Sequence, residues 1–445
     1  MRNDNIAAIS TALGAAGVAV IRISGDNPLD IAEKMFVPST KKAVRDFEPN
    51  RMYAGEILAD GFSDYGMCVF FRAPASFTGE NTVEFHTHGG TAITKGVLKK
   101  ILSLGARLAE NGEFTRRAFL NGKLSLASAE GLIDMINSES AGGVRAGYSL
   151  YREKLTREVE NMQEVLTAAL SQIDADMDFP EEGLEETSRE KVCKAVEEVI
   201  DKTRSLISTF AAGSRVKNGV KVGIVGKPNT GKSSLLNALL HFERAIVSDV
   251  AGTTRDVVEG NADIKGVRFL FSDTAGIRES EDKIENMGVA LSRRVLEESD
   301  VLLFVMDASD ITEEDRKIKK LIKDKNVITV INKSDKNSVT DERADVYVSA
   351  LTGENIDAVK DALYERAVGS ETDLNGDYLC EERHYRALIR AEKSLEEAQA
   401  GVKTLPLDLV ATDIKSGWDA LGEISGKTAS EDIIDDIFSR FCVGK

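Results

Sequence analysis

Residues 226–233 read Gly-Lys-Pro-Asn-Thr-Gly-Lys-Ser and lie between the apolar run KVGIV (221–225) and the run SLLNALL (234–240). A strand that leads through a glycine-rich loop into a helix is the context of a phosphate-binding loop. The glycines let main-chain N–H groups face phosphates, and the helix N-terminus adds its dipole. We therefore predict that Lys232 neutralises the β- and γ-phosphates of a nucleotide and that Ser233 ligates Mg²⁺. The predicted contacts of this loop are Asn229, Thr230, Gly231, Lys232, Ser233 and Ser234.

From residue 220 to 351, short apolar runs such as RFLFSD (268–273), VLLFVMD (301–307) and VITVIN (327–332) alternate with helical patterns. This alternation is typical of a parallel sheet covered by helices. Polar motifs follow the predicted strands in a fixed order. The nucleotide contacts predicted from these motifs are Ser248, Asp249, Val250, Ala251, Gly252, Thr253, Thr254, Asp273, Thr274, Ala275, Gly276, Asn332, Lys333, Asp335, Ser349 and Ala350.

Each motif has a chemical role. Thr254 is the candidate that reaches Mg²⁺ and senses the γ-phosphate, and the N–H of Gly276 faces the same phosphate. Asp273 holds Mg²⁺ through water. Asp335 accepts hydrogen bonds from the ring N–H and the exocyclic amine of guanine, which adenine does not offer together. The order of the motifs therefore predicts GTP rather than ATP, with Lys232, Thr254 and Gly276 serving hydrolysis.

One position departs from the Ras pattern, because Ile277 follows Asp273-Thr274-Ala275-Gly276 where Ras-type GTPases keep a water-orienting glutamine. Asn229 either braces the phosphate-binding loop or supplies an oxygen ligand to a monovalent cation that replaces an arginine finger. The residues alone leave both readings open.

Length, charge and cysteine content limit the number of domains, the partners and the compartment of the protein. A chain of 445 residues is too long for one core, and no apolar run is long enough to span a bilayer. The net charge of −17 argues against coating nucleic acid by bulk electrostatics. Four scattered cysteines without a CxxC pair fit a reducing compartment, and we expect a cytoplasmic protein.

The pattern along the chain predicts a multidomain α/β protein. We expect an N-terminal α+β domain over 1–120 and a helical domain made of 121–215 and 372–445. A Ras-like P-loop G domain with a mostly parallel sheet is expected as an insertion over 216–371.

Four further stretches of sequence resemble those of a known family. They are IAAISTALGAAGVAVIRISG (6–25), SFTGENTVEFHTHGG (76–90), GEFTRRAFLNGKL (112–124) and the terminal FCVGK (441–445). Together with the inserted G domain, the chain resembles the tRNA modification GTPase MnmE (TrmE) family over its whole length. The resemblance implies a homodimer through the N-terminal domain and an FAD-containing partner, MnmG. It also implies addition of an aminomethyl or carboxymethylaminomethyl group to C5 of the wobble uridine of certain tRNAs.

The resemblance also implies ligands. The one-carbon unit comes from 5-formyl- or methylene-tetrahydrofolate, and K⁺ with GTP brings two G domains together to switch on hydrolysis. The residues that match the family's folate positions are Arg22, Glu84, Lys123 and Lys445. Those that match its potassium cage are Asn229, Ser248, Val250 and Thr253, and Glu285 matches the glutamate that orients the attacking water.

Several readings stay open at this point. Arg22 and Glu84 are either folate contacts or ordinary strand-end charges, and Cys442 is either a thiol involved in modification or a small apolar residue near a chain end. His86 and His88 share one face of a predicted strand but lack a third metal ligand nearby. Two other functions compete: a ribosome-assembly GTPase of the Era or Der kind, and a switch without chemistry at its own folate site.

Overall fold

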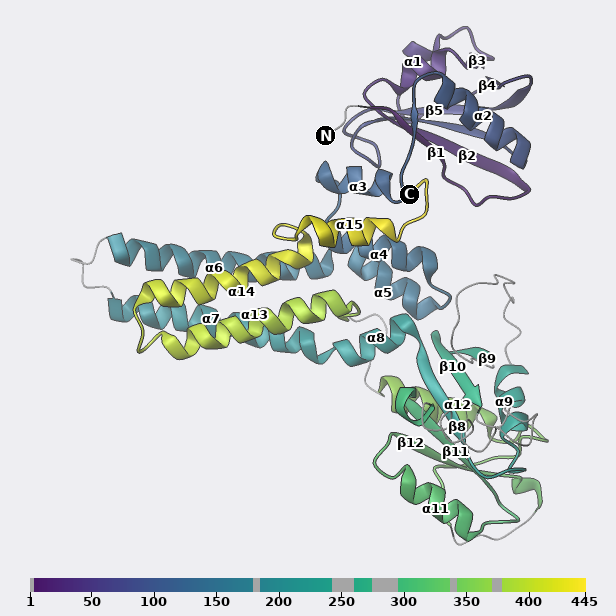
Figure 1. Cartoon of the computed structure of the whole chain (residues 1–445), viewed down its shortest axis with the longest axis vertical. Helices are drawn as coiled ribbons and strands as arrows, with labels where there is room; N and C mark the ends of the chain where they lie inside the picture. The colour runs from purple at the N-terminus through teal and green to yellow at the C-terminus, as the bar shows by residue number, and fades with distance from the viewer. Residues whose placement is uncertain (1–3, 179–184, 242–259, 274–294, 337–341, 370–377) are drawn as a thin grey trace, which may run out of the picture. The chain divides into compact units, whose positions relative to one another are not determined.

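The computed structural model describes residues 4–178, 185–241, 260–273, 295–336, 342–369 and 378–445. Its elements form two sheets and a group of long helices (Figure 1). Contacts between Cα atoms divide the chain into two compact units. The first unit comprises Met1–Ile133, Leu150–Gln163 and Trp418–Lys445, and the second comprises Asp134–Ser149 and Glu164–Gly417.

The first unit holds a seven-stranded sheet with the order β3-β4-β5-β6-β2-β1-β7. Its strands are β1 (Ile6–Ile9), β2 (Ala16–Gly25), β3 (Phe36–Pro38), β4 (Met52–Leu58), β5 (Ser63–Phe71), β6 (Asn81–Gly89) and β7 (Arg107–Leu108). Neighbouring strands are antiparallel, except that β1 and β7 are parallel. A short 3-10 helix, η1 (Val44–Asp46), precedes β4.

Helices α1 (Pro28–Glu33) and α2 (Thr91–Ser103) cover one face of this sheet. Val97 and Ile101 of α2 pack there in one core with inward side chains such as Phe85. Because side chains alternate along a strand, every second residue of β4 is buried. The opposite face bears Met52, Met67 and Tyr65, whose exposures are 49%, 45% and 62%.

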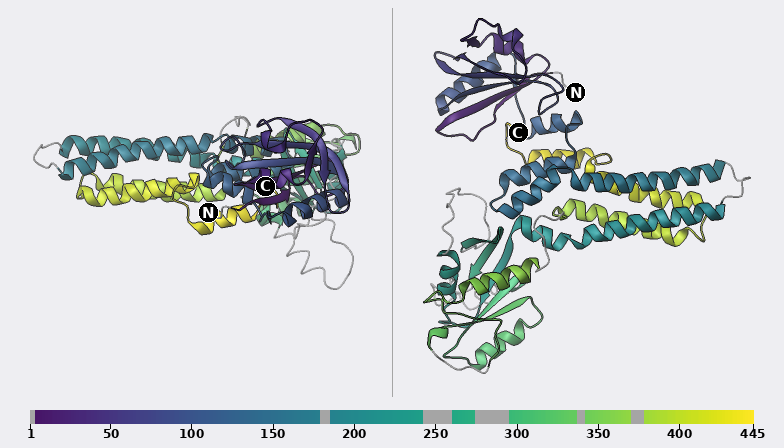
Figure 2. Two further views of the ribbon diagram at one scale, coloured as in Figure 1. Left: turned by 90° about the horizontal axis from the view of Figure 1, so that it is seen from above. Right: turned by 180° about the vertical axis from the view of Figure 1, so that it is seen from behind.

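A group of helices follows. They are α3 (Glu113–Leu120), α4 (Leu126–Asn137), α5 (Ala141–Tyr151), α6 (Lys154–Asp178), α7 (Glu185–Ser208), α8 (Phe210–Asn218), α13 (Glu382–Gly401), α14 (Leu407–Ser425) and α15 (Glu431–Ser439). Helices α6, α7, α13 and α14 run side by side in every view (Figures 1 and 2). The stretch 125–178, which reads as helical throughout, is three helices, and the Ser140 hydroxyl accepts a hydrogen bond from the Gly143 N–H at the start of α5.

The second sheet has the order β13-β12-β11-β8-β10-β9. Its strands are β8 (Val220–Val225), β9 (Gly260–Ile264), β10 (Val267–Asp273), β11 (Val301–Asp307), β12 (Val327–Asn332) and β13 (Val346–Tyr347). All neighbours are parallel except β9 and β10. The parallel sheet predicted for the G domain is confirmed, which places the motif-bearing strand ends at one edge.

Helices cover both faces of this second sheet. Helices α9 (Lys232–His241) and α12 (Ile356–Val368) share one apolar core with it, and α11 (Glu313–Leu321) packs in another through Ile318. The 3-10 helix η3 (Ser334–Lys336) follows β12. The multidomain α/β class is therefore confirmed. Within the described ranges, no helix combines the length and apolar character needed to cross a membrane.

Candidate nucleotide-binding site

The phosphate-binding loop leaves β8 at Gly226 and enters α9 at Lys232. Gly226 and Gly231 have φ angles of +151° and +90°. A Cβ at Gly226 would lie 2.3 Å from the Val305 carbonyl oxygen, and one at Gly231 would lie 2.3 Å from the Asn332 amide nitrogen. Both positions therefore require glycine, because the loop turns tightly against β11 and β12.

The ammonium of Lys232 lies inside this loop, where it donates to the carbonyl oxygens of Gly226 (3.0 Å) and Lys227 (2.8 Å). A phosphate oxygen bears more negative charge than a carbonyl oxygen, so the same ammonium can turn to phosphates. Ser233 and Ser234 are exposed in the first turn of α9. The loop thus presents a cation, a hydroxyl and a helix N-terminus together, which suits a nucleotide phosphate with Mg²⁺.

Asn332 joins the three loops that the sequence predicts to bind guanine nucleotide. Its side-chain amide donates to the Thr230 carbonyl oxygen at 2.9 Å, and its side-chain oxygen accepts from the Ala350 N–H at 3.0 Å. Asn332 is 2% exposed. A buried amide with both ends paired fixes the base-binding motifs relative to the phosphate-binding loop.

Asp335 is exposed, as a residue that meets a base edge requires. The Ser349 hydroxyl, which is fully buried, donates to its Oδ1 at 2.6 Å. This bond leaves Oδ2 and further lone pairs for guanine and holds the carboxylate in one orientation. The structure therefore brings together Asn332, Asp335, Ser349 and Ala350 from two neighbouring loops.

Two contacts at this edge were not predicted from the sequence. Lys333 donates to Asp307 Oδ2 at 2.6 Å and to the Asn229 carbonyl oxygen at 2.8 Å. Burial opposes the charge of Asp307, but Lys333 and Ser309 outweigh it and lower the pKa of Asp307 to about 2. The position of Asp307 at the end of an apolar strand was the available signal.

The second unpredicted contact is a buried cation in the phosphate-binding loop. Lys227 is 7% exposed and forms ion pairs with Asp310 (3.0 Å) and Asp315 (3.1 Å). Burial lowers the pKa of Lys227, but these two carboxylates outweigh burial and raise it. The loop is therefore anchored to the N-terminus of α11, where Thr312 and Asp315 form a capping box.

The remaining predicted nucleotide residues lie outside the described ranges. These are Ser248, Asp249, Val250, Ala251, Gly252, Thr253, Thr254, Thr274, Ala275, Gly276 and Glu285, together with Ile277. Asp273 ends β10, and its backbone is in register with Ile224 of β8.

The candidate folate residues lie in the first unit. Arg22 of β2 and Glu84 of β6 are cross-strand neighbours, and Arg22 Nε donates to Glu84 Oε1 at 2.7 Å. Burial raises the pKa of Glu84, but His86 and Arg22 outweigh burial and lower it. The Arg22 guanidinium also lies 5.4 Å from the ring centre of Phe77 and 5.6 Å from that of Phe114. A charged pair between aromatic rings suits a ligand with a flat ring and charged groups.

The C-terminus reaches the same helix that carries Phe114. The Phe114 N–H donates to the Lys445 carbonyl oxygen at 3.2 Å. Asn111 and Val443 form an isolated antiparallel β-bridge. Lys123 donates to the Pro74 carbonyl oxygen at 3.0 Å. Cys442 is a free, exposed cysteine beside Gly112, whose N–H donates to its carbonyl oxygen at 3.5 Å.

His86 and His88 do not form a metal centre with each other. His86 Nε2 lies 3.4 Å from Glu84 Oε2, and His88 Nδ1 lies 2.6 Å from Asp64 Oδ1. In the part of the chain that the structure describes, no three His, Cys, Asp or Glu side chains gather as metal ligands.

Comparisons with known proteins cover the whole chain. The family model described as "MnmE helical domain" matches residues 126–442, and the one described as "GTP-binding protein TrmE N-terminus" matches residues 5–123. The tRNA modification GTPase MnmE of Desulforamulus reducens is 40% identical over 461 residues, covering 100% of both chains. The protein of the same name from Caldicellulosiruptor saccharolyticus is 36% identical over 455 residues, again covering 100% of both.

Among solved structures, a crystal structure of Aquifex aeolicus Era bound to GDP and AlF4⁻ is 33% identical, covering 39% of this chain and 66% of that chain. Its TM-score is 0.27, a value too low to carry a conclusion.

Proposed function

The chain belongs to the tRNA modification GTPase MnmE (TrmE) family, and on that premise we propose that its G domain couples GTP hydrolysis to modification of the wobble uridine of certain tRNAs. It is a GTP-hydrolysing enzyme that takes part in tRNA modification. We assign the N-terminal domain to 1–120, the helical domain to 121–215 and 372–445, and the G domain to 216–371. We also place the protein in the cytoplasm.

The observation that carries the nucleotide site is the buried Asn332 amide, which ties the phosphate-binding loop to both guanine-binding motifs. GTP binds with its phosphates at Lys232 and its base at Asp335. Ser233 and Thr254 ligate Mg²⁺, which neutralises charge on the β- and γ-phosphates when bound. Glu285 orients the attacking water.

A potassium ion takes the place of an arginine finger. Asn229, Ser248, Val250 and Thr253 hold it through oxygen atoms. The left-handed backbone of Asn229, with φ of +66°, leaves its side chain exposed at the loop, which supports this role. K⁺ with GTP joins the G domains of two protomers and starts hydrolysis.

The N-terminal domain binds 5-formyl- or methylene-tetrahydrofolate through Arg22, Glu84, Lys123 and Lys445, and it forms the homodimer. Exposed Met67 lies opposite His86 and Met52 opposite Val69 in the sheet register, so these side chains share the face that bears Arg22 and Glu84. Apolar side chains at that exposed face support a dimer contact there.

An FAD-containing, MnmG-like partner completes the enzyme. Together the two proteins add an aminomethyl or carboxymethylaminomethyl group to C5 of the wobble uridine. The methylene carbon comes from the folate, which leaves as tetrahydrofolate, and the nitrogen comes from ammonia or glycine, respectively. The C5 hydrogen and one amine hydrogen end on the released tetrahydrofolate. Cys442 is a candidate thiol for this chemistry.

A reconstitution experiment tests this function. The purified chain is incubated with the FAD-containing partner, tRNA, methylene-tetrahydrofolate, ammonium or glycine, and GTP in K⁺ buffer, and the nucleosides are identified by mass spectrometry. We expect a C5-modified wobble uridine only when every component is present. Full product without folate, or with a non-hydrolysable GTP analogue, would contradict the proposed chemistry or its coupling to hydrolysis.

A further inference from the structure

The segment from Pro74 to Glu80, here called the 74–80 loop, contacts two of the candidate folate residues. Its Phe77 ring lies 5.4 Å from the Arg22 guanidinium, and its Pro74 carbonyl oxygen accepts from Lys123 at 3.0 Å. A Cβ built at Gly79 would lie 3.2 Å from Cγ of Lys123. The position of this loop therefore fixes the surroundings of Arg22 and Lys123.

Glu80 closes the 74–80 loop through its own backbone. Its carbonyl oxygen accepts from the Ser76 hydroxyl, at 2.5 Å, and its N–H donates to the Thr78 hydroxyl at 3.2 Å. Its carboxylate accepts from the Ser24 hydroxyl of β2 at 2.7 Å. A movement of Glu80 would therefore change the whole loop, including Phe77.

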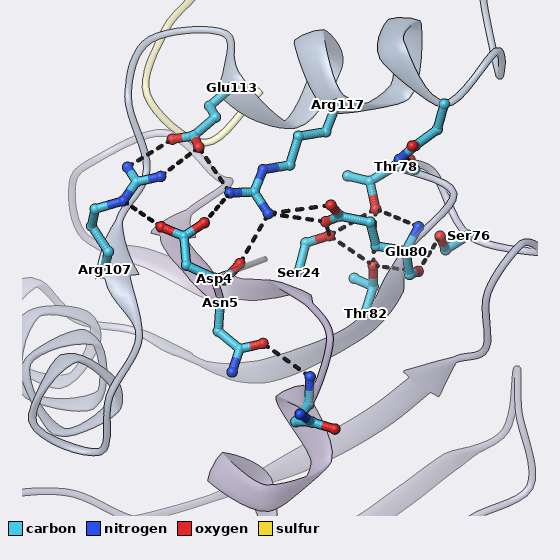
Figure 3. A network of polar contacts seen from close by, with 12 residues as sticks. Asp4, Asn5, Ser24, Ser76, Thr78, Glu80, Thr82, Arg107, Glu113 and Arg117 are labelled. Carbon is cyan, nitrogen blue, oxygen red and sulfur yellow. Dashed lines mark hydrogen bonds and ion pairs between the residues drawn. The ribbon is translucent and has the colours of Figure 1, made fainter. Parts of the chain in front are cut away.

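Arg117 of α3 holds that carboxylate from the other side (Figure 3). Its Nη1 lies 3.2 Å from both Glu80 oxygens, and its Nη2 contacts Asp4 (2.7 Å) and Glu113 (3.0 Å). Arg117 is 9% exposed. Burial lowers the pKa of Arg117, but Asp4, Glu80 and Glu113 outweigh burial and raise it, so the guanidinium stays charged.

Arg107 provides an internal comparison in the same network. It donates to Asp4 Oδ2 (2.9 Å) and to both oxygens of Glu113 (3.0 and 2.7 Å). Figure 3 shows the two guanidiniums beside the same two carboxylates, with Arg117 alone placed against Glu80. The two arginines share two acidic partners and differ in the third.

Packing alone does not hold Glu80 in place. A cavity of about 370 Å³ opens beside the network, and its lining includes Glu80, Arg117 and Asn121. Asn121 donates to the Thr78 carbonyl oxygen at 2.7 Å. Phe77 of the loop packs against two apolar clusters. The part of the loop that carries Glu80 instead faces this cavity, whose lining is mostly polar, so polar contacts set the position of Glu80.

We infer that Arg117 is a positioning residue for folate binding and acts through Glu80 on the 74–80 loop, an inference that rests on the folate function proposed above. When the Arg117 guanidinium is absent, the Glu80 carboxylate keeps its contact with Ser24 but loses the cation that pairs with it. The loop then moves away from Arg22 and Lys123. A lysine at 117 keeps the charge but lacks the planar fork that reaches three carboxylates at once.

The test compares Arg117→Lys, Arg107→Lys and Glu80→Gln in the full-length chain. Calorimetry with 5-formyltetrahydrofolate measures affinity, thermal unfolding measures stability, and K⁺-stimulated GTP hydrolysis reports on the G domain. We expect Arg117→Lys and Glu80→Gln to weaken folate binding about tenfold, the lower end of the loss seen when the partners that orient metal-binding residues are removed. The folate affinity of Arg107→Lys should stay within about twofold of the wild type, although its unfolding temperature falls as much as that of Arg117→Lys. All variants should keep wild-type GTP hydrolysis.

The double variant Arg117→Lys with Glu80→Gln should bind folate no more weakly than the weaker single variant, since both act on one contact. Equal losses in Arg107→Lys and Arg117→Lys, or wild-type affinity in Arg117→Lys, would overturn the inference. If Arg117→Lys does not fold, the folate affinity of Glu80→Gln tests the inference instead, and wild-type affinity in that variant would overturn it. A wild-type chain that binds no folate, or an Arg22→Ala variant with full affinity, would instead reject the folate function and the inference with it.

Discussion

We propose that Asp335 determines which base the site accepts. Replacing it with asparagine turns one acceptor into a donor, which suits the 2-oxo group of xanthine and leaves guanine's amine unpaired. We expect Asp335→Asn to weaken GTP binding by at least about 2 kcal/mol and to bind the xanthine nucleotide instead. Nucleotide titrations measure both.

Ser349→Ala is the matched control for that substitution, because it removes the hydroxyl that donates to the Asp335 carboxylate but keeps the carboxylate itself. It should weaken GTP binding without changing the preferred base. An Asp335→Asn variant with undiminished preference for guanine would show that the carboxylate does not read the base.

At this same scale, motifs predicted the residues whose role depends on near neighbours, such as Lys232 and Asp335. The motifs did not reveal ion pairs between residues that are distant in sequence. Lys227 pairs with Asp310, 83 positions away, and Lys333 with Asp307, 26 positions away. Only the parallel sheet brings these strand ends together, so local spacing could not show the pairs.

The phosphate-binding loop is the element that should distinguish potassium from sodium. We expect GTP hydrolysis to be faster in K⁺ than in Na⁺, and Asn229→Gly to remove the difference by lowering the K⁺ rate to the Na⁺ rate. Glycine is the suitable substitution because it accepts the φ of +66° found at this position, whereas alanine would add strain. Steady-state rates in the two salts measure the effect.

Equal wild-type rates in K⁺ and Na⁺ would exclude the cation site. An Asn229→Gly variant that still hydrolyses GTP faster in K⁺ than in Na⁺ would show that Asn229 is not a ligand of the cation. The asparagine would then only brace the loop.

Among the elements, the helices of the helical domain and the apolar strands followed from the sequence, and a polar strand did not. The apolar strands β8, β10, β11 and β12 match the predicted runs. Strand β9 (GNADI) was not anticipated, because it is short and contains Gly260, Asn261 and Asp263. Its antiparallel pairing with β10 depends on the neighbouring strand and not on its own residues.

On the scale of the whole chain, three ionisable residues meet where the chain enters the G sheet from α8 and leaves it toward α13. Lys217, at the end of α8, contacts Asp134 of α4 at 2.8 Å and also pairs with Glu381, the residue before α13. Burial, together with the nearby Glu381 carboxylate, raises the pKa of Asp134 to about 8, while Lys217 opposes the shift. Asp134 therefore keeps a proton in the folded chain at neutral pH.

This proton makes stability depend on pH. Between the ordinary aspartate pKa and about 8, the folded state binds a proton that the unfolded state has lost, so the contribution of Asp134 to stability falls as pH rises through that range. Asparagine resembles the neutral carboxyl group and has no proton to lose. We expect the stability of Asp134→Asn relative to wild type to increase from pH 5 to pH 8 in urea unfolding followed by circular dichroism.

Asp357→Asn serves as the control, since it makes the same substitution at a side chain that is 86% exposed. A constant difference between Asp134→Asn and wild type across the range would mean that Asp134 is ionised in the folded chain.

We propose that GTP turnover by this chain drives wobble-uridine modification. The direct measurement is the level of modified wobble uridine, by mass spectrometry of tRNA from cells whose only copy is absent, wild type or Glu285→Ala. A water-orienting group acts mainly in the transition state, so the variant should bind GTP normally and hydrolyse it very slowly. We predict full modification with the wild type and a level near that of the deletion with Glu285→Ala. Wild-type modification from a variant whose hydrolysis is confirmed lost, or full modification in the deletion, would contradict it.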